Sequence, residues 1–270
     1  MSPKLTDTNA LRLHRARAKG DRLFLQESAA DEIEDRLSVV NRAFMNVAVV
    51  TPFPSVWRMR LPEAHIVADD ETLTLDEAHF DLVIHSMSLH WANDPVGQLI
   101  QCRRALKPDG LLIGATLGGQ TLQELRSALG EAEVQVSGGL SPRVAPMGEI
   151  RDLGGLLQRA GFALPVADSV SLPAEYRDAL HLMRDLRDMG ETNALSQRRR
   201  NCPPRGLFVE MAQIYDQNFK TMAGRVNATY EIVFLTGWAP DDSQPKPLRP
   251  GSAKHRLAEA LKVPEVPLRD

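Results

Sequence analysis

One stretch of the chain, residues 80–117, constrains the fold most because it reads as a complete strand–helix–strand unit. Residues 81–85 (DLVIH) are a short apolar run without polar alternation, which is typical of a parallel strand buried on both faces. Asp94-Pro95 indicates a helix start, with the carboxylate as N-cap and proline in the first turn. Lys107–Gly110 then predicts a turn, and residues 111–117 predict a second buried strand. The stretch therefore predicts a βαβ unit of an α/β fold.

The loop after the first of these strands, residues 86–93, is the expected functional surface. In open α/β sheets, ligands bind beyond the carboxyl ends of the strands. His90 and Trp91 pair a titratable ring with an aromatic one, so we interpret them as substrate or partner contacts on the rim of the crevice. The alternative is a hydrogen-bonded histidine and a core tryptophan. Ser86, at the strand end, is a candidate cofactor contact.

Several motifs resemble known families. The segment FDLVIHSMSLHW, with the helix and the LKPDGLL that follow, resembles the fourth strand, helix and fifth strand of class I S-adenosylmethionine (SAM)-dependent methyltransferases. A more specific resemblance is to the mitochondrial complex I assembly factor 5 group, in the motifs LHWANDP, GGQTLQELR, SPRVAPMGEIRDLGGLLQRAGFALPVADS and YEIVFLTGWAP. The malonyl-carrier-protein methyltransferase is a more distant relative. The resemblance implies a Rossmann-like, mostly parallel sheet with an antiparallel last strand, residues 226–238, and SAM as cofactor.

The glycine motif expected of a SAM-binding sheet is degraded in this chain. Such a sheet needs glycines directly after its first strand, here residues 46–51, so that backbone N–H groups can approach the ligand. Residues 51–57 instead read TPFPSVW, and no glycine occurs between Gly20 and Gly97. Two prolines remove amide donors, and the aromatic side chains add bulk. We expect the cofactor site to be filled and SAM binding to be impaired or lost.

Spacing predicts that one early strand–helix unit is missing. Only residues 52–63 separate Thr51 from the next apolar segment, residues 64–68 (AHIVA). A parallel crossover needs a dozen residues or more, so one crossover fits and two do not.

Two acids follow that segment, and their roles stay open. By resemblance, Asp69 or Asp70 matches the acid that holds the adenine amine after the family's third strand. In a second alignment Asp69 is the acid that binds the ribose hydroxyls, because it lies 18 positions after Thr51 (69 − 51) and about 20 are expected. Both alignments make these acids candidate cofactor contacts.

The domain organisation follows from the same patterns. Residues 1–45 predict an N-terminal helical segment, and residues 46–240 predict the methyltransferase-like α/β domain. That domain carries a helical insertion at about residues 174–222. Residues 241–270 predict a proline-rich tail.

Composition excludes several classes of function. The net charge of −3 gives no electrostatic case for nucleic acid, and no apolar run approaches the roughly 20 residues that span a bilayer. The two cysteines lack nearby ligand partners, so no metal site is predicted. The N-terminal residues carry no apolar signal-peptide core, and we expect a cytoplasmic location.

Two functional classes remain. In the first, the chain is a pseudoenzyme that serves as a binding or assembly protein, with a respiratory-complex subunit or a carrier protein as partner. In the second, it is an active SAM-dependent methyltransferase on a small-molecule, carrier-protein or protein acceptor. The assembly factor group is also associated with hydroxylation of an arginine of a complex I subunit, so the resemblance leaves a different chemistry open. Residues 51–63 favour the first class.

Overall fold

A computed structural model describes residues 4–245 and residue 262. The chain divides into two units, Met1–Pro240 and Asp241–Asp270, and every helix and strand given below belongs to the first. The expected tail over residues 241–270 falls outside the described residues, apart from residues 241–245 and 262. The other domain boundaries stay predictions.

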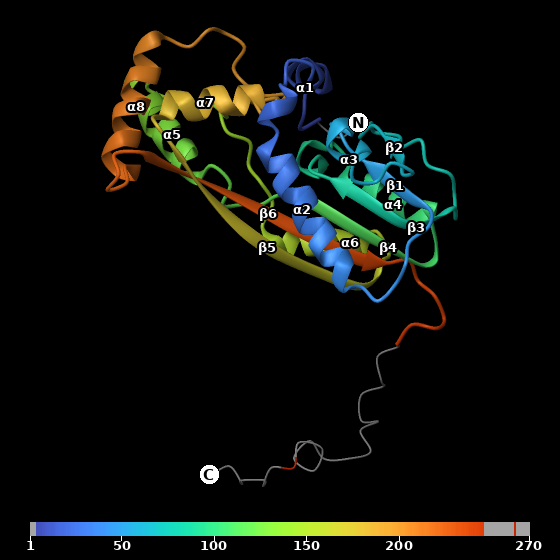
Figure 1. The fold of residues 1–270 in the computed structure, drawn as a ribbon. Helices are drawn as coiled ribbons and strands as arrows, with labels where there is room; N and C mark the ends of the chain where they lie inside the picture. Colours follow the sequence, from blue (N-terminus) through green and yellow to red (C-terminus); the bar gives the residue numbers. More distant parts are fainter. Residues whose placement is uncertain (1–3, 246–261, 263–270) are drawn as a thin grey trace, which may run out of the picture. The chain divides into compact units, whose positions relative to one another are not determined.

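Six strands form one sheet in the order β2-β1-β3-β4-β6-β5 (Figure 1). The strands β2, β1, β3 and β4 run parallel to one another, whereas β6, the last strand in the chain, is antiparallel to both β4 and β5. The predicted fold, a Rossmann-like and mostly parallel sheet with an antiparallel last strand, is therefore confirmed. The strands are β1 (Val47–Val50), β2 (His65–Val67), β3 (Phe80–Ser86), β4 (Leu106–Leu117), β5 (Ala163–Tyr176) and β6 (Val226–Trp238).

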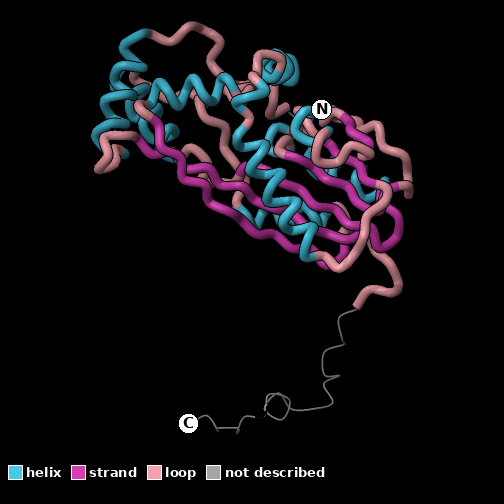
Figure 2. Tube along the Cα trace, in the orientation of Figure 1, coloured by secondary structure: helices cyan, strands magenta, loops and turns pink. Residues whose placement is uncertain are grey.

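The sheet has helices on both faces (Figure 2). One face packs against α4 (Pro95–Ala105) and α6 (Ile150–Arg159), and the other packs against α2, α5, α7 and α8. Because successive side chains of a strand point to opposite faces, Val83 lies in the first of these cores and Ile84 in the second, and both are fully buried. The expectation of strands buried on both sides is confirmed.

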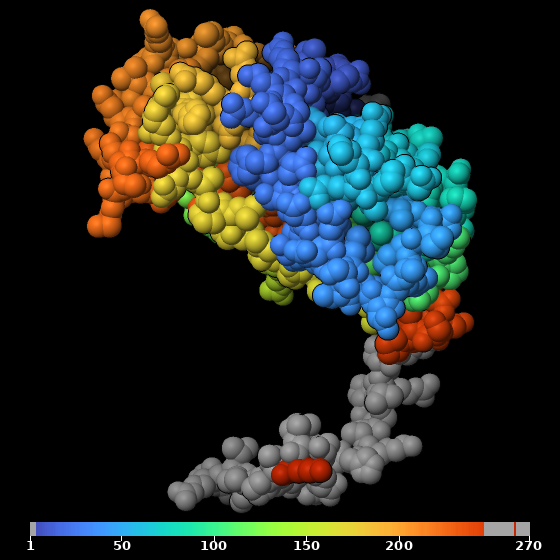
Figure 3. All heavy atoms as spheres, viewed as in Figure 1, coloured from blue at the N-terminus to red at the C-terminus, as the bar shows by residue number. Residues whose placement is uncertain are grey.

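The remaining elements have these bounds. The helices are α1 (Thr8–Arg15), α2 (Phe24–Val39), α3 (Pro54–Arg58), α5 (Gln123–Ser137), α7 (Ala179–Asp188) and α8 (Arg205–Phe219), with single short turns η1 (Gly20–Arg22) and η2 (Leu89–Trp91). In the space-filling view, the blue atoms of α1 and α2 fill the region between the cyan part of the chain that follows them and the yellow part that includes α7 (Figure 3).

The crossover between β1 and β2 is as short as the spacing requires. It contains the one helix α3, of five residues, and β2 then pairs directly with β1 in parallel, Val49 opposite Ile66. One early strand–helix unit is therefore absent from this part of the described chain. The strand that precedes Asp69 consequently lies next to β1 in the sheet.

One turn differs from expectation. β4 begins at Leu106, so Lys107–Gly110 belongs to the strand and forms a bulge in its pairing with β3. Asp109 adopts a left-handed φ of 57° there, which explains why the segment has the composition of a turn.

Replacing Ile84 with alanine should lower the free energy of unfolding by about 2–5 kcal/mol, because the side chain is fully buried in mid-sheet and its removal leaves a cavity. Urea denaturation of both proteins measures the difference. A loss under about 1 kcal/mol would mean that β3 is not at the centre of the sheet.

Candidate functional site

A crevice of about 760 Å³ opens at the carboxyl ends of β1 and β2. We call it the crevice throughout. Its lining comes from α1, from the chain after β1, from the chain after β2, and from the loop after β3: Lys4, Thr8, Leu11, Arg12, Arg15, Ala16, Thr51, Pro52, Phe53, Pro54, Ile66, Val67, Ala68, Asp69, Asp70, Glu71, Trp91, Ala92, Asn93, Asp94 and Gln98. This is the edge of an open α/β sheet at which ligands bind.

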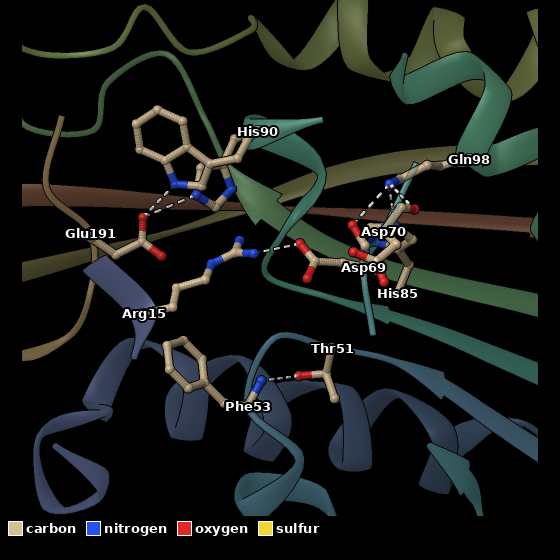
Figure 4. A network of polar contacts seen from close by, with 10 residues as sticks. Arg15, Thr51, Phe53, Asp69, Asp70, His85, His90, Gln98 and Glu191 are labelled. Atoms are coloured by element: carbon tan, nitrogen blue, oxygen red, sulfur yellow. Dashed lines mark hydrogen bonds and ion pairs between the residues drawn. The ribbon is translucent and has the colours of Figure 1, made fainter. Parts of the chain in front are cut away.

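The floor of the crevice offers a ligand no backbone donor from residues 52–54. Pro52 and Pro54 have no amide hydrogen, and the N–H of Phe53 donates to the Thr51 hydroxyl at 3.1 Å (Figure 4). The expectation that aromatic side chains fill the site is wrong, however. Phe53 lines the crevice, but Trp57 is fully buried in the core beneath α2, and the space remains open. The crevice is therefore open, but residues 52–54 offer a ligand no free backbone N–H.

Asp69 is already engaged by the protein itself. Its Oδ2 accepts a hydrogen bond from Arg15 Nη1 at 2.7 Å, and only 12–13% of either side chain is exposed (Figure 4). Asp70 also lines the crevice, and that residue is exposed. Both predicted acids therefore line the crevice, but the carboxylate of Asp69 is already paired with Arg15 of α1.

Gln98 fixes this segment from the other side. Its Nε2 donates to the backbone carbonyls of Asp69 and Asp70, at 3.3 Å and 3.0 Å. Its Oε1 therefore accepts from His85 Nε2, 2.9 Å away. Burial lowers the pKa of His85, which keeps this ring neutral and suits a structural role. Gln98 was not identified from the sequence because its partners lie 28 and 29 positions away.

Ser86 does not reach the crevice. Its hydroxyl is buried at the end of β3 and lines neither of the pockets described here. The side chain points into the packed interior because both faces of β3 are covered. Its predicted role as a cofactor contact has no support in this geometry.

His90 and Trp91 are covered and do not form an exposed rim. Both lie in η2, and both ring nitrogens reach Glu191 Oε2, His90 Nε2 at 3.2 Å and Trp91 Nε1 at 2.8 Å (Figure 4). Trp91 is 4% exposed and packs with Leu11 of α1 and with Leu195. The sequence could not place α1 and residues 191–195 over this loop, which is why it predicted a rim.

A second pocket of about 340 Å³ also has Trp91 in its lining. We call it the Glu191 pocket. Most of its lining is apolar, and it includes Leu25, Leu117, Leu122, Leu125, Leu129, Met147, Met183, Leu186, Phe208 and Tyr230, together with His14, Arg143, Glu191 and Arg198. Trp91 lines both spaces.

Glu191 is an ionised carboxylate in this interior. Burial alone would raise its pKa, but the attraction of His90 and its hydrogen bond, the charge of Arg15 and the Trp91 N–H outweigh burial and lower the pKa below the usual value. Its Oε1 is buried without a hydrogen-bond partner among the described residues.

Among the described residues, no three His, Cys, Asp or Glu side chains converge as metal ligands. No described helix is long and apolar enough to cross a membrane.

Trp91→Phe should destabilise the protein by about 1.5–3 kcal/mol, because it keeps an aromatic ring, although a smaller one, but removes the one N–H that Trp91 donates to a buried carboxylate. Thermal and urea unfolding measure the loss. An unchanged stability would show that Glu191 does not depend on this donor. Trp238→Phe is the matched control, because this ring is half-buried on β6, away from Glu191.

Comparison with known proteins identifies the family to which this chain belongs. A family described as "Methyltransferase domain" matches residues 35–114. The zebrafish (Danio rerio) protein "Arginine-hydroxylase NDUFAF5, mitochondrial" is 39% identical over 225 residues, which cover 83% of this chain and 70% of that protein. The malonyl-acyl-carrier-protein O-methyltransferase of Methylovorus sp. (strain MP688) is 37% identical over 175 residues, covering 65% of this chain and 56% of that protein.

Solved structures that resemble this chain are less similar to it in sequence. The crystal structure of a putative methyltransferase from Bacillus halodurans is 13% identical, with a TM-score of 0.48, and the match covers 77% of this chain and 97% of that one. The zebrafish relative is much nearer in sequence, at 39% identity. The chain therefore belongs to the NDUFAF5 family of methyltransferase-like proteins.

Proposed function

We propose that this chain is a binding protein that acts on a subunit during assembly of a respiratory complex, and that its binding of SAM is impaired or lost. The observation that carries the proposal is the engagement of Asp69 by Arg15 at 2.7 Å, above a floor without backbone donors. Membership of the NDUFAF5 family supports the link to complex I assembly. A cytoplasmic location stays a prediction, since the zebrafish relative carries the word mitochondrial in its name.

The crevice fits SAM in volume but not in contacts. A nucleoside whose hydroxyls or amine need a carboxylate would have to displace Arg15 from Asp69, and the freed cation would then lack a partner in a largely covered position. Arg15 Nε and Nη2 are already buried, and neither has a hydrogen-bond partner among the described residues. The prolines at positions 52 and 54 remove the amides that would hold the methionine part.

The names of the relatives suggest two kinds of partner for this chain. The name arginine-hydroxylase makes an arginine side chain of a partner protein the group on which recognition centres. The Methylovorus relative instead suggests a carrier protein as partner. Neither the net charge of −3 nor loop 86–93, which is largely covered, favours a carrier protein over a respiratory-complex subunit as the partner.

The second candidate is an active SAM-dependent methyltransferase on a small-molecule, carrier-protein or protein acceptor. The volume of the crevice, about 760 Å³, favours it, because ligand sites commonly measure about 300–1,000 Å³. SAM would supply its own electrophilic methyl group, so the protein would act by orientation. The Glu191 pocket, across Trp91, would then receive the acceptor.

Titration of the purified protein with SAM and with S-adenosylhomocysteine decides between these candidates. We expect binding that is weak or absent in calorimetry. Arg15→Ala should tighten it about tenfold, since it frees Asp69 to accept hydrogen bonds from the ligand. A dissociation constant in the low micromolar range for the unmodified protein would return the methyltransferase to first place.

Arg12→Ala is the matched control for this experiment. It removes the same charge from the same helix and from the same crevice lining, but it leaves the pair between Arg15 and Asp69 intact. Equal effects of the two variants would mean that net charge, and not the engagement of Asp69, limits binding.

A further inference from the structure

The connection between α7 and α8, residues 189–204, is long for a segment without helix or strand. It has 16 residues (204 − 188) and passes beside α1 (Figure 1). Among the described residues, its one ladder contact is the isolated bridge between Leu195 and Thr6. Connections in compact domains usually have about 4–6 residues, and those longer than about 12–15 commonly serve as lids or binding loops.

Part of this connection forms a wall of the Glu191 pocket. Thr192, Asn193, Arg198 and Arg199 all belong to the pocket lining. We call residues 192–202 the lid. Glu191, directly before the lid, is held by the ring N–H groups of η2, and two prolines follow at positions 203 and 204. The lid is therefore a stretch of pocket wall between two restrained ends.

Ion pairs join the lid to helices on either side of it. Arg198 pairs with Asp7, the N-cap of α1, at 2.9 Å, and 19% of each side chain is exposed. Arg199 Nη1 lies 3.8 Å from Glu133 of α5, a covered carboxylate that also pairs with Arg143 at 2.7 Å. The basic run of residues 198–200 thus connects α1 to α5 by charge.

The backbone of the lid has few further attachments. Asp7 N–H donates to the carbonyl of Ala194, and Ser196 N–H donates to the carbonyl of Leu5, both at 2.8 Å. Asn193 Nδ2 also donates to the carbonyl of Pro142 at 2.8 Å. All of these hydrogen bonds lie in residues 193–196, so the amide of Ser196 is a reporter of whether the lid is closed.

The apolar contacts of the lid are separate from the cores of the sheet. Ala194 and Leu195 pack with Leu11, Trp91 and Ala145 in one small cluster of buried residues. The two large cores on the faces of the sheet contain none of these side chains. Segments with few buried apolar contacts open at a lower free energy than the core does. The lid is therefore able to open without loss of the sheet.

We propose that the lid opens away from the Glu191 pocket, by release of Arg198 from Asp7 and of Arg199 from Glu133, while the sheet stays folded. Opening exposes Ala145 and the apolar walls of the pocket, so the lid controls the entry of ligands. Arg198 is the main hold, because Arg200 lies 3.4 Å from the same carboxylate but is 71% exposed. This inference does not rest on the proposed function, since it holds whether or not SAM binds.

Hydrogen exchange of the full chain tests the opening. In the unmodified protein, the amide of Ser196 should exchange at least about tenfold faster than the amides of β3. Asp7→Asn keeps the acceptor for Ala10 N–H at the N-cap but removes the charge that holds Arg198. It should speed exchange over residues 192–202 by about tenfold and leave exchange in β3 unchanged.

A thiol placed under the lid tests access to the pocket. Ala145 is 6% exposed and lines the pocket, so Ala145→Cys in a Cys202→Ser background should react slowly with iodoacetamide. Met222→Cys, at a fully exposed position, gives the rate of an unprotected thiol. Cys102 does not compete, because burial raises the pKa of its thiol to about 12. Asp7→Asn should speed the reaction at position 145 by about tenfold.

Three variants make the result specific to the lid. Arg198→Gln removes the same ion pair from its other side and should act like Asp7→Asn. Arg200→Gln carries the same change two positions away in the exposed part of the run, and it should change either rate by less than about twofold. Asp178→Asn repeats the aspartate substitution at the N-cap of α7, where the carboxylate pairs with exposed Arg177, and it should have no effect. Melting curves establish that each variant is folded.

The proposal is overturned if Asp7→Asn and Arg198→Gln leave exchange and thiol reaction unchanged. It is also overturned if exchange in the lid and in β3 rises by the same factor, because the segment then unfolds only with the whole domain. Faster exchange in the lid without a faster reaction at position 145 would show that the lid does not control access. Tight binding of SAM would refute the proposed function and leave all of these outcomes as they are.

Discussion

The ion pair between Arg15 and Asp69 is the contact on which the arrangement of the site depends. It joins α1 to the end of β2 across 54 positions of the sequence, at 2.7 Å, with both side chains largely covered. One side of the crevice is thereby closed by α1, and the carboxylate that a nucleoside would need is taken. Gln98 holds the backbone of the same segment from the opposite side, so Asp69 has little freedom to turn away from Arg15. The pair thus fastens the end of α1 to the segment after β2 and occupies one carboxylate of the crevice lining.

The two spaces that Trp91 lines differ in their polar groups. In the crevice, residues 52–54 comprise two prolines and an amide that is already bonded within the protein, so this segment offers a ligand no backbone N–H. The Glu191 pocket is smaller and most of its lining is apolar, and Glu191 Oε1 has no hydrogen-bond partner there among the described residues. Trp91 links the two because it packs under α1 and donates to Glu191.

Local patterns predicted most of the sheet. The apolar runs that became β1 and β3 needed no knowledge of their partners, and the count of residues between Thr51 and Ala64 was sufficient to exclude a second crossover. Asp69 and Asp70 could be placed at the crevice because they come shortly after a strand, whereas the direction of the Ser86 side chain depends on what covers β3. The roles of all three as cofactor contacts stay predictions. Glu191 and Arg15 could not be found, since the contact from Trp91 to Glu191 spans 100 positions and no period or motif connects them. The burial of His90 and Trp91 could not be predicted for the same reason, because α1 and Glu191, which contact them, lie far away in the sequence.

A structure of the protein crystallised with a large excess of S-adenosylhomocysteine tests the central claim most directly. The account predicts that Arg15 remains paired with Asp69 and that no nucleoside is ordered in the crevice. An adenosine group seated between α1 and β2, with its hydroxyls on Asp69 and Arg15 displaced, would contradict it.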